Sequence, residues 1–470
     1  MKTIQAAAGS EEYRAKIDEL QEQLRDFREH PRLVQSPEEL ERLEKEIREK
    51  TDALAALITA QQIQHSLDSE PLQEAQSRLV DEWPQRLKNH ERAGVWVRTA
   101  CGALVWIEAA YFRRKGKRPG KKRYPGFYLG LLLLGINERC TPGFAAEASL
   151  LAAMLGSLAE ARQVLAERGI LIDIKALRTL AYRFSERARL TQQVAGPGFD
   201  EKVGGRRVVI SMDGGRIRIK EKKRGPKTAK GRSRYHGAWR EPKLFIVYVV
   251  DAEGKLERSF MPIMDAVIRG PDMLFDLLRS YLKQLGIAAA DQVLFVADGA
   301  RWIWNRIAAL VRALGLKSEQ VFEAIDFYHA VEHLGKVAGL RTSWNATQRK
   351  TWVRRHRKLL REGQVEKVIT AVREVCRGRN SKGIRTERDY FVRNASRMAY
   401  DRVRALKLPI GSGSVESAIR RVVNLRLKGP CIFWYKENAE AILLLRCYWK
   451  AGRWNQLKQL ANSLVPAAYA

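Results

Sequence analysis

The chain is expected to be a multidomain protein whose largest part is an α/β fold. Its 470 residues exceed what one compact hydrophobic core usually holds, so several folding units are expected. In the N-terminal part, apolar residues recur with the spacing of helices, whereas after residue 205 they gather in the short runs typical of strands. The order of these patterns predicts helical domains first and an α/β domain after them.

Residues 1–68 are expected to form a coiled coil or helical hairpin that serves oligomerisation. Apolar residues over Tyr13–Phe27 step by four and three, which is the seam pattern of a coiled coil. Pro31 ends this helix, and the Ser36–Glu39 segment predicts a second helix that starts with a capping box. Its seam continues at Leu40, Leu43, Ile47, Leu54 and Leu57. We expect self-association into a homodimer or a larger assembly, and a hairpin packed on its own chain is the alternative.

Residues 90–125 are expected to form a β-hairpin followed by a basic linker. Valine and aromatic residues between Val95 and Arg114 surround Cys101-Gly102, as expected of two strands and the turn between them. The basic stretch Arg113–Arg118 comes next.

Residues 126–195 are expected to form a helical DNA-binding domain. Three short amphipathic segments follow one another: Phe144–Leu155, Leu158–Arg168 after the capping residue Ser157, and Ile174–Arg189 after Asp173. This pattern is typical of a helix-turn-helix, whose last helix enters the major groove of DNA. The DNA contacts expected on that helix are Lys175, Arg178, Arg183 and Arg187. A three-helix bundle with a solvated basic face is the alternative.

The charge of the chain favours a polyanionic partner. Lys and Arg number 85 against 53 Asp and Glu, giving a formal net charge of +32. Double-stranded DNA is the expected partner, although composition alone does not distinguish it from RNA or anionic lipid. No apolar run approaches the roughly 18 residues that a membrane helix needs, so no membrane partner is expected. The N-terminus lacks the pattern of a secretory signal, and we expect a cytoplasmic protein.

Residues 205–338 carry the strand patterns. Four short apolar runs cover residues 208–212, 244–250, 260–263 and 293–297, and a helix pattern over Met273–Leu285 precedes the fourth. Three strands, then a helix and a strand, with further helices following, is the order expected of an RNase H-like α/β domain. We assign residues 205–338 to the first part of that core and residues 409–470 to its second part.

A basic segment interrupts the first two strand patterns. Residues Lys220–Arg240 are dense in Lys and Arg and contain Gly225-Pro226 and Gly231, so we expect a mobile loop. Beside an active site such a loop would act as a DNA clamp through Lys222, Lys223 and Arg224. A solvated surface hairpin is the alternative.

Two aspartates stand at the ends of predicted strands. Asp213 follows the run at residues 208–212, and Asp298 follows the run at residues 293–297. A buried carboxylate without a positive partner is costly, and a divalent cation would remove that cost. Because the carboxyl ends of parallel strands share one edge of a sheet, both groups are expected there. Asp-Gly is also a common start of a turn, which is the structural alternative for either residue alone.

Glu416 is the third acidic residue of interest. It lies in the glycine-rich segment Gly411–Ser417, near the start of a predicted helix that also carries Arg420 and Arg421. Cleavage and joining of phosphodiesters need an activated oxygen nucleophile and a stabilised leaving oxygen, which two Mg²⁺ ions about 3.5–4 Å apart provide. Carboxylate oxygens suit Mg²⁺ or Mn²⁺. Asp213, Asp298 and Glu416 are therefore the expected metal ligands and catalytic residues.

Four motifs resemble a known family. They are Ser211-Met212-Asp213-Gly214, Val296-Ala297-Asp298-Gly299, the segment Ala324–Leu334 and the segment Gly411–Ser417. Over roughly Val95 to Trp449 the chain resembles bacterial insertion-sequence transposases of the Kra-type and Lre-type groups, which are relatives of the Mutator-like enzymes. The resemblance implies a DDE triad of Asp213, Asp298 and Glu416, a helical insertion before the glutamate, and a place at the bacterial nucleoid.

Further residues follow from this resemblance. Asp326 and His329 are similar to the C/D-x-x-H signature of Mutator-like relatives, which implies a supporting role; a capped helix start is the alternative. Residues 339–408 are expected to be the helical insertion domain, where Arg354 and Arg355 would contact DNA. Trp344 and Trp352 would stack on a base there or, alternatively, fill the core.

One feature departs from the family. Members of these groups often carry cysteine pairs for zinc, whereas Tyr111–Tyr124 contains none, and the five cysteines form no C-x-x-C pair. We therefore expect no structural zinc. The expected function is transposition: binding of terminal inverted repeats, metal-dependent cleavage and strand transfer. The alternatives are an RNase H-like nuclease or junction resolvase, and a domesticated transposase that only binds DNA.

Overall fold

The computed structural model describes residues 3–4, 10–116, 126–229, 231–379 and 381–464. The chain divides into two compact units, which are treated separately below. We call Met1–Val194 with Leu457–Ala470 the N-terminal unit, and Ala195–Gln456 the sheet unit. Most of the predicted basic linker, residues 117–125, lies outside the described residues. Among the described residues, no helix has both the length and the apolar composition needed to cross a membrane.

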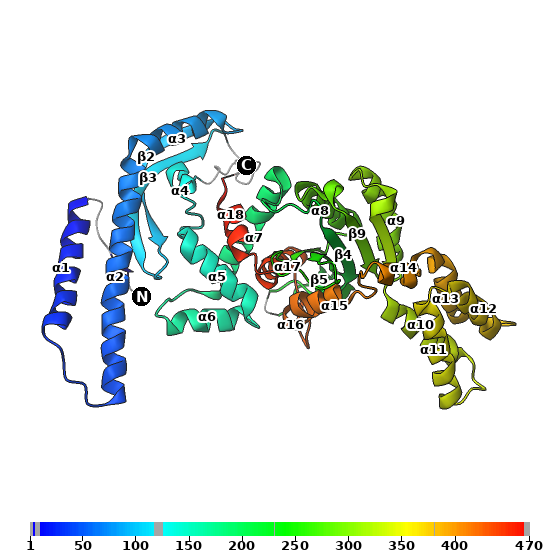
Figure 1. The fold of residues 1–470 in the computed structure, drawn as a ribbon. Helices are drawn as coiled ribbons and strands as arrows, with labels where there is room; N and C mark the ends of the chain where they lie inside the picture. The colour runs from blue at the N-terminus through cyan, green and yellow to red at the C-terminus, as the bar shows by residue number, and fades with distance from the viewer. Residues whose placement is uncertain (1–2, 5–9, 117–125, 230, 380, 465–470) are drawn as a thin grey trace. The chain divides into compact units, whose positions relative to one another are not determined.

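The N-terminal unit begins with two long helices, α1 (Ser10–Glu29) and α2 (Pro37–Asp68), which lie side by side (Figure 1). The predicted start of α2 is confirmed, since Ser36 accepts a hydrogen bond of 3.2 Å from the Glu39 amide. Tyr13 and Ile17 of α1 are buried in the core of their own chain, as the hairpin alternative requires. Further along the seam, Leu40 and Ile47 are 48% and 36% exposed.

The predicted β-hairpin is confirmed, with longer bounds. It consists of β2 (Leu87–Arg98) and β3 (Leu104–Arg114), which pair in antiparallel register. The two-residue strand β1 (Thr3–Ile4) adds to β3, and α3 (Glu70–Glu82) precedes the hairpin. No helix was predicted for residues 70–82.

The three helices predicted within residues 126–195 are confirmed. They are α5 (Pro142–Met154), α6 (Leu158–Glu167) and α7 (Ile174–Ala195), and the short helix α4 (Leu129–Leu133), which was not predicted, precedes them. Ser157 accepts a hydrogen bond of 3.0 Å from the Glu160 amide, and Asp173 accepts one of 2.9 Å from the Ala176 amide. Both predicted caps are therefore in use.

The sheet unit is built on a five-stranded mixed sheet in the order β10-β9-β4-β7-β8. Strands β4, β9 and β10 are parallel, whereas β7 is antiparallel to both β4 and β8. The strands are β4 (Arg207–Gly214), β7 (Lys243–Val250), β8 (Ile263–Val267), β9 (Gln292–Ala297) and β10 (Val321–Ile325). The predicted third strand at residues 260–263 is wrong by three residues, because Pro262 has no N–H to donate to a ladder.

Helices cover both faces of the sheet (Figure 1). On one face lie α8 (Pro271–Gln284) and α9 (Arg301–Ala313), whose apolar side chains share a core with alternate residues of β4 and β7. On the other lie α15 (Gly413–Ile419), the π-helical turn Arg420–Asn424, α16 (Leu425–Leu427) and α17 (Lys436–Lys450). The chain ends in α18 (Trp454–Asn462).

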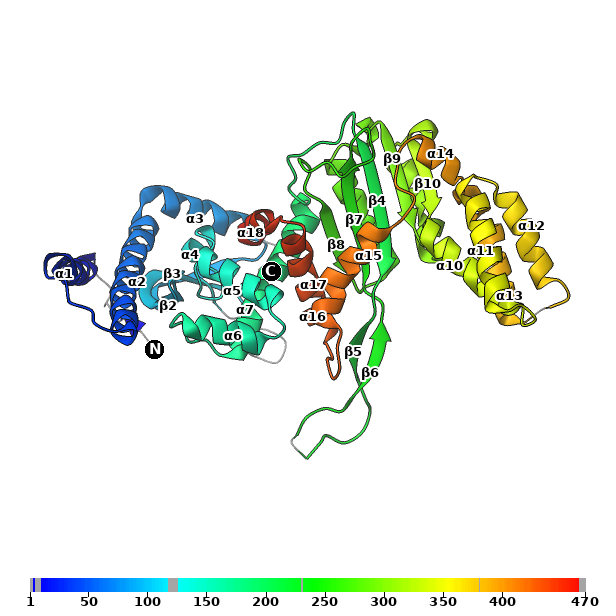
Figure 2. The same ribbon diagram turned by 60° about the horizontal axis from the view of Figure 1, so that its bottom comes forward.

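The predicted mobile loop at Lys220–Arg240 is wrong. The segment belongs to an antiparallel ribbon of β5 (Ile217–Lys222) and β6 (Tyr235–Arg240), as the hairpin alternative described. Figure 2 shows the ribbon projecting beyond the end of the sheet. Its strands were missed because basic residues dominate β5, although buried Ile217 and Ile219 keep the alternation of a strand.

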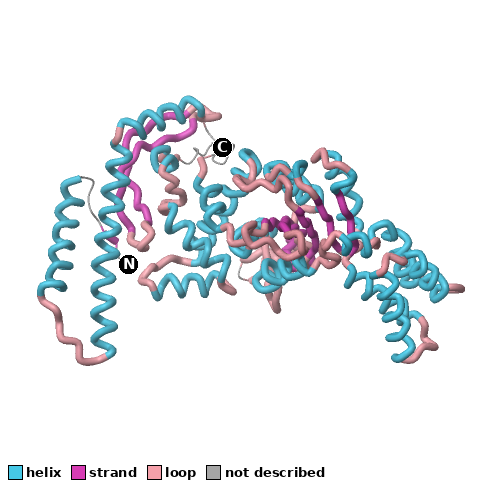
Figure 3. Tube along the Cα trace, viewed as in Figure 1, coloured by secondary structure: helices cyan, strands magenta, loops and turns pink. Residues whose placement is uncertain are grey.

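A helical segment separates the two parts of the sheet unit, as predicted (Figure 3). After α10 (Phe327–Leu340) come α11 (Ala346–Arg361), α12 (Val365–Cys376), α13 (Lys382–Asn394) and α14 (Tyr400–Ala405). Trp344 and Trp352 lie with their rings 5.9 Å apart and pack against the hydrophobic core. Core packing therefore accounts for both tryptophans, and base stacking by them stays a prediction.

Candidate active site

Three aspartates follow equivalent positions of adjacent parallel strands. Met212 of β4 pairs with Ala297 of β9, and Ala297 pairs with Ile325 of β10. The next residues along these strands are Asp213, Asp298 and Asp326. The register therefore brings the predicted pair Asp213 and Asp298 to one edge of the sheet and adds Asp326 beside them.

Asp213 and Asp298 are half-buried and make only short-range hydrogen bonds. Asp213 Oδ1 accepts from the Gly214 amide at 2.6 Å, and Asp298 Oδ1 accepts from the Ala300 amide at 3.0 Å. The Trp304 indole donates to the Asp298 carbonyl at 2.6 Å, which fixes the backbone at the strand end. Among the described residues, the second oxygen of each carboxylate thus accepts no hydrogen bond from the protein.

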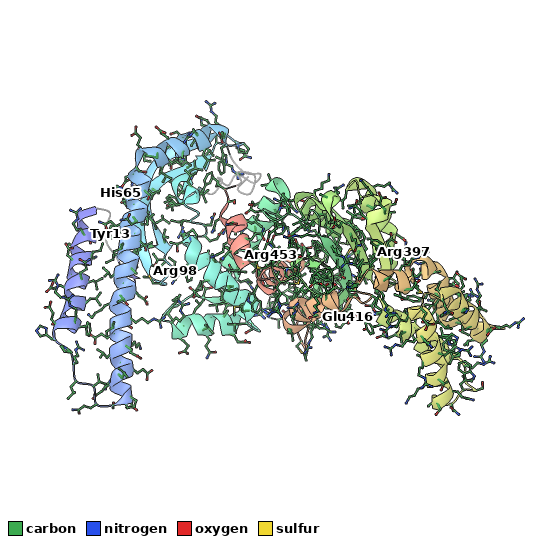
Figure 4. The ribbon with its side chains drawn as sticks, in the orientation of Figure 1. Tyr13, His65, Arg98, Arg397, Glu416 and Arg453 are labelled. Carbon is green, nitrogen blue, oxygen red and sulfur yellow. The ribbon has the colours of Figure 1, made fainter. Side chains whose placement is uncertain are left out.

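Glu416 approaches the same edge from a helix. It lies in the first turn of α15, which begins at Gly413 and packs on β4 and β7 through residues such as the buried Val415. Its side chain, labelled in Figure 4, is 50% exposed, so this carboxylate meets solvent. The predicted helix start is confirmed, and the helix continues through the π-helical turn at Arg420–Asn424.

His329 lies beside two acids of this edge, Asp326 and Glu416. Its Nδ1 lies 3.5 Å from Asp326 Oδ1 and 3.6 Å from Glu416 Oε1. These distances are too long for strong hydrogen bonds, and they suit a charge held between two carboxylates. The Asp326 carboxylate raises the pKa of His329 to about 9, so the imidazole is positive at neutral pH.

Asp326 has a different role from Asp213 and Asp298. It is completely buried and caps α10, with Oδ1 accepting from the His329 amide at 2.8 Å. Its Oδ2 accepts from the Ser412 hydroxyl at 2.6 Å and also from the Ser412 amide. Burial alone would raise the pKa of Asp326, but these hydrogen bonds hold it well below its usual range. Asp326 therefore ties the start of α10 to the segment that leads into Glu416.

The electrostatics of the edge are unfavourable without a further positive charge. Burial raises the pKa of Asp213 to about 6, and repulsion from Asp298 and Glu416 adds to it. Burial also raises the pKa of Asp298. The nearby Lys243 pairs with Glu241 at 2.7 Å instead. In the part of the chain that the structure describes, no Lys or Arg forms an ion pair with Asp213 or Asp298.

This donor set fits divalent cations. Half-buried carboxylates with raised pKa values and free oxygens are hard ligands in need of positive charge, which is the chemistry that Mg²⁺ or Mn²⁺ meets. Another possible ligand set, Asp326, His329 and Glu416, is the one among the described residues whose ligand atoms all lie within 4.8 Å of one another. It is the weaker set, because both oxygens of Asp326 already accept hydrogen bonds.

The predicted DNA contacts on α7 are mostly exposed, with one correction. Lys175 and Arg178 are exposed, and Arg183 is exposed but pairs with Glu186 at 2.6 Å. Arg187 is only 5% exposed, pairs with Glu138 at 2.5 Å and donates to the Ala461 carbonyl at 3.1 Å. The prediction that Arg187 contacts DNA is therefore wrong, because its guanidinium is used inside the N-terminal unit.

The remaining basic residues of the prediction lie on the surface of the sheet unit. Lys222, Lys223 and Arg224 are exposed at the end of β5 and beyond it, and Arg354 and Arg355 are exposed on α11. Arg420 is exposed, whereas Arg421 is half-buried and its carbonyl accepts a hydrogen bond from Arg446.

Sequence reasoning missed Ser412 as part of the site. Its two hydrogen bonds to Asp326 join residues that are 86 positions apart, so no local sequence pattern predicts them. It also missed the aromatic residues of the β5–β6 ribbon, Tyr235 and Trp239, which are 45% and 44% exposed.

Comparison of the chain with protein-family models, with curated proteins and with solved structures finds no match. The functional assignment therefore depends on the geometry and chemistry of the site.

Proposed function

We propose that the protein is a DNA transposase that cleaves DNA ends and transfers them to a target with the carboxylates Asp213, Asp298 and Glu416. One observation carries the proposal. Asp213 and Asp298 follow paired residues of two parallel strands, and a helix packed on β4 brings Glu416 to the same edge. Two half-buried acids that have no basic partner and lie close to a third acid are costly unless they hold cations.

The arrangement of elements supports an RNase H-like fold as part of the proposal. Along the chain, strands β4, β7 and β8 are followed by α8, β9, α9 and β10, and all five of these strands belong to one mixed sheet. This is the order of three strands, a helix, a strand and further helices from which that fold was predicted. The helices α11–α14 between α10 and α15 support the predicted insertion.

Bound Mg²⁺ or Mn²⁺ would supply an activated oxygen nucleophile and stabilise the departing 3′ oxygen. Asp213 and Asp298 would hold the cations from the rigid ends of β4 and β9, whose registers fix the spacing of the two carboxylates. Glu416 would complete the set from α15. His329, positive at neutral pH and half-exposed, would donate to a phosphate oxygen at the same edge.

Asp326 acts as a positioning residue in this scheme. Because both its oxygens are engaged by His329 and Ser412, it holds α10 and the Gly411–Glu416 segment in one arrangement. Among the described residues, Glu416 makes no hydrogen bond to the sheet, so its place depends on how that segment is held.

Double-stranded DNA as the partner, self-association and a nucleoid location belong to the same proposal. The net charge of +32 supports binding to a polyanion, and the exposed Leu40 and Ile47 on α2 offer an apolar strip for a second copy. A nuclease or resolvase would use the same acids, so cleavage alone does not distinguish it from a transposase. Joining of a cleaved 3′ end to a second DNA does.

The experiment uses labelled duplexes made from the DNA that flanks the gene on each side, with a supercoiled plasmid as the target. With Mg²⁺ or Mn²⁺ we expect 3′-end cleavage and joined products, and we expect neither from Asp298→Asn. Asp276→Asn, an exposed acid on α8 that pairs with Arg279, is the matched control and should keep full activity. Cleavage without joining would support the nuclease, and normal cleavage by Asp298→Asn would refute the proposed site.

A further inference from the structure

The two faces of the β5–β6 ribbon differ in how their charges are neutralised. In an antiparallel pair, residues directly opposite each other point to the same face. On one face Glu221 pairs with His236 at 3.1 Å and also with Arg240. That face is therefore neutralised within the ribbon.

The opposite face carries a row of cations without acidic partners. Every second residue from Arg216 onwards is basic, in the order Arg216, Arg218, Lys220 and Lys222. Among the described residues, none of these four forms an ion pair with a carboxylate. Instead the charged groups of Arg216, Arg218 and Lys220 lie over aromatic rings. Arg218 is 4.9 Å from the ring centre of Trp239, and Lys220 is 4.7 Å from that of Tyr235.

The aromatic rings come from two segments that are distant in sequence. Trp239 and Tyr235 stand opposite Arg218 and Lys222 on β6. Residues 432–435 run beside β5, where the Lys220 amide donates to the Trp434 carbonyl at 2.7 Å and the Trp434 amide donates to the Arg218 carbonyl at 2.9 Å. This added segment brings Phe433 and Tyr435 onto the same face.

One glycine makes this face possible. Gly237 stands opposite Lys220, and a Cβ atom there would lie 2.4 Å from the Phe433 ring. Its absence lets Phe433 lie flat on the ribbon, where Tyr235 meets it edge-on at 5.7 Å. The result is a built surface of alternating rings and cations, which we call the aromatic face: Arg216, Arg218, Lys220, Tyr235, Trp239 and Tyr435, with Phe433 at its centre.

The rings remain available to a ligand. Trp239, Tyr235 and Tyr435 are 44%, 45% and 56% exposed, although large aromatic side chains normally bury their surface. The face also begins a few residues along the chain from the candidate site. β5 starts four residues after Asp213, and the Gly215 amide donates to the Pro242 carbonyl at 2.8 Å where the ribbon leaves the sheet. Five residues from Asp213 to Arg218 span about 17 Å of strand.

We propose that the aromatic face binds an unpaired DNA strand beside the cleavage site. Exposed rings stack on bases of any sequence, and the cations between them pair with the phosphates, which is the pattern of single-strand binding surfaces. A duplex hides the faces of its bases and would use only the cations. The ribbon, about 20 Å long, accommodates a few nucleotides. The choice of DNA rests on the proposed function, whereas the preference for unpaired bases rests on the aromatic face alone.

The test measures binding of the full-length protein to a labelled oligo(dT) strand and to a duplex of the same length, in EDTA so that cleavage plays no part. Trp239→Ala with Tyr235→Ala should weaken binding to the strand by about 10-fold or more and binding to the duplex by less than about 2-fold. Trp239→Phe, which keeps a ring, should retain most of the affinity.

Two arginines on opposite faces of the ribbon provide a variant and its matched control. Arg218→Ala on the aromatic face should weaken strand binding, whereas Arg240→Ala on the neutralised face should not. Cross-linking of 5-iodouracil in the strand to peptides containing Tyr235 or Trp239 would support direct stacking.

Other results would overturn the proposal. Equal losses for strand and duplex would make the ribbon a backbone clamp, and unchanged strand binding in the double variant would exclude it altogether. Displacement of the strand by polyglutamate as effectively as by unlabelled oligo(dT) would show a site for acidic chains in general. If wild-type protein binds the strand as expected but never cleaves flanking DNA, the proposed function fails while the aromatic face stands.

Discussion

The sheet edge and the interior of the N-terminal unit both hold ionisable side chains away from water, but they treat them in opposite ways. Arg187 is buried with a carboxylate partner and a carbonyl acceptor. Asp213 and Asp298 are half-buried beside other acids, with only backbone amides as donors. A buried charge paired with an opposite charge supports the fold that surrounds it, whereas acids gathered without a basic partner imply a ligand that brings the missing charge.

The largest effect on stability is expected at Arg187, because this buried and paired side chain has a structural role. Arg187→Ala should destabilise the protein by about 2–4 kcal/mol, because it removes a buried guanidinium and leaves Glu138 and the Ala461 carbonyl unpaired. Arg178→Ala, at an exposed position of the same helix, should change stability by less than about 0.5 kcal/mol. Thermal unfolding measures both. An unchanged melting temperature for Arg187→Ala would mean that the pair is not structural.

The spacing of α7 could have revealed this residue. Arg187 lies three residues after Phe184 and seven after Leu180, both completely or nearly completely buried, so it shares their face of the helix. The basic side chain of Arg187 predicts a DNA contact, whereas its position on the apolar face of the helix predicts burial. Asp213 and Asp298 were predictable because an acid directly after an apolar strand is a local pattern. The Asp326–Ser412 tether was not, since it depends on how distant segments meet.

A single substitution can loosen the segment that leads into Glu416. Ser412→Ala removes the hydroxyl donor to Asp326 and keeps the amide donor. We expect cleavage to slow by about 10–100-fold, the range typical of residues that orient metal ligands. Ser414→Ala in the same segment, whose hydroxyl does not contact Asp326, is the control. The Mg²⁺ concentration that gives half-maximal cleavage should also rise, because the metal would be bound more weakly. Slower cleavage with an unchanged half-saturating Mg²⁺ concentration would contradict the positioning role.

The unfavourable charge at the sheet edge should itself be measurable. Because burial raises the pKa of Asp213 to about 6, folding disfavours its charged form, and the protein loses stability as pH rises from about 4 to 6. Asp213→Asn lacks this penalty. In EDTA at pH 7 it should be more stable than wild type by about 1–2 kcal/mol after allowance for solvent screening, and the gain should vanish below pH 4. A gain that persisted at pH 3.5 would have another cause.

The smallest expected effect concerns the helical hairpin. Leu20 and Leu54 pack against the core of their own chain, so lysine there would unfold the unit rather than report on assembly. Leu40→Lys with Ile47→Lys changes only the exposed strip of α2. If that strip joins two copies, the variant should become monomeric in light scattering with an unchanged melting temperature. A wild-type protein that is already monomeric would leave only the intrachain hairpin.

We propose that Asp213, Asp298 and Glu416 hold the cations and that the Asp326–His329 pair does not. Electron paramagnetic resonance counts the Mn²⁺ bound to the protein and can compare the variants Asp213→Asn, Asp298→Asn, Glu416→Gln and His329→Gln with the control Asp276→Asn. We expect each of the first three variants to lose bound Mn²⁺, while His329→Gln and the control keep it. Loss of Mn²⁺ from His329→Gln with retention in Asp213→Asn would contradict the account and assign the metal to the other ligand set.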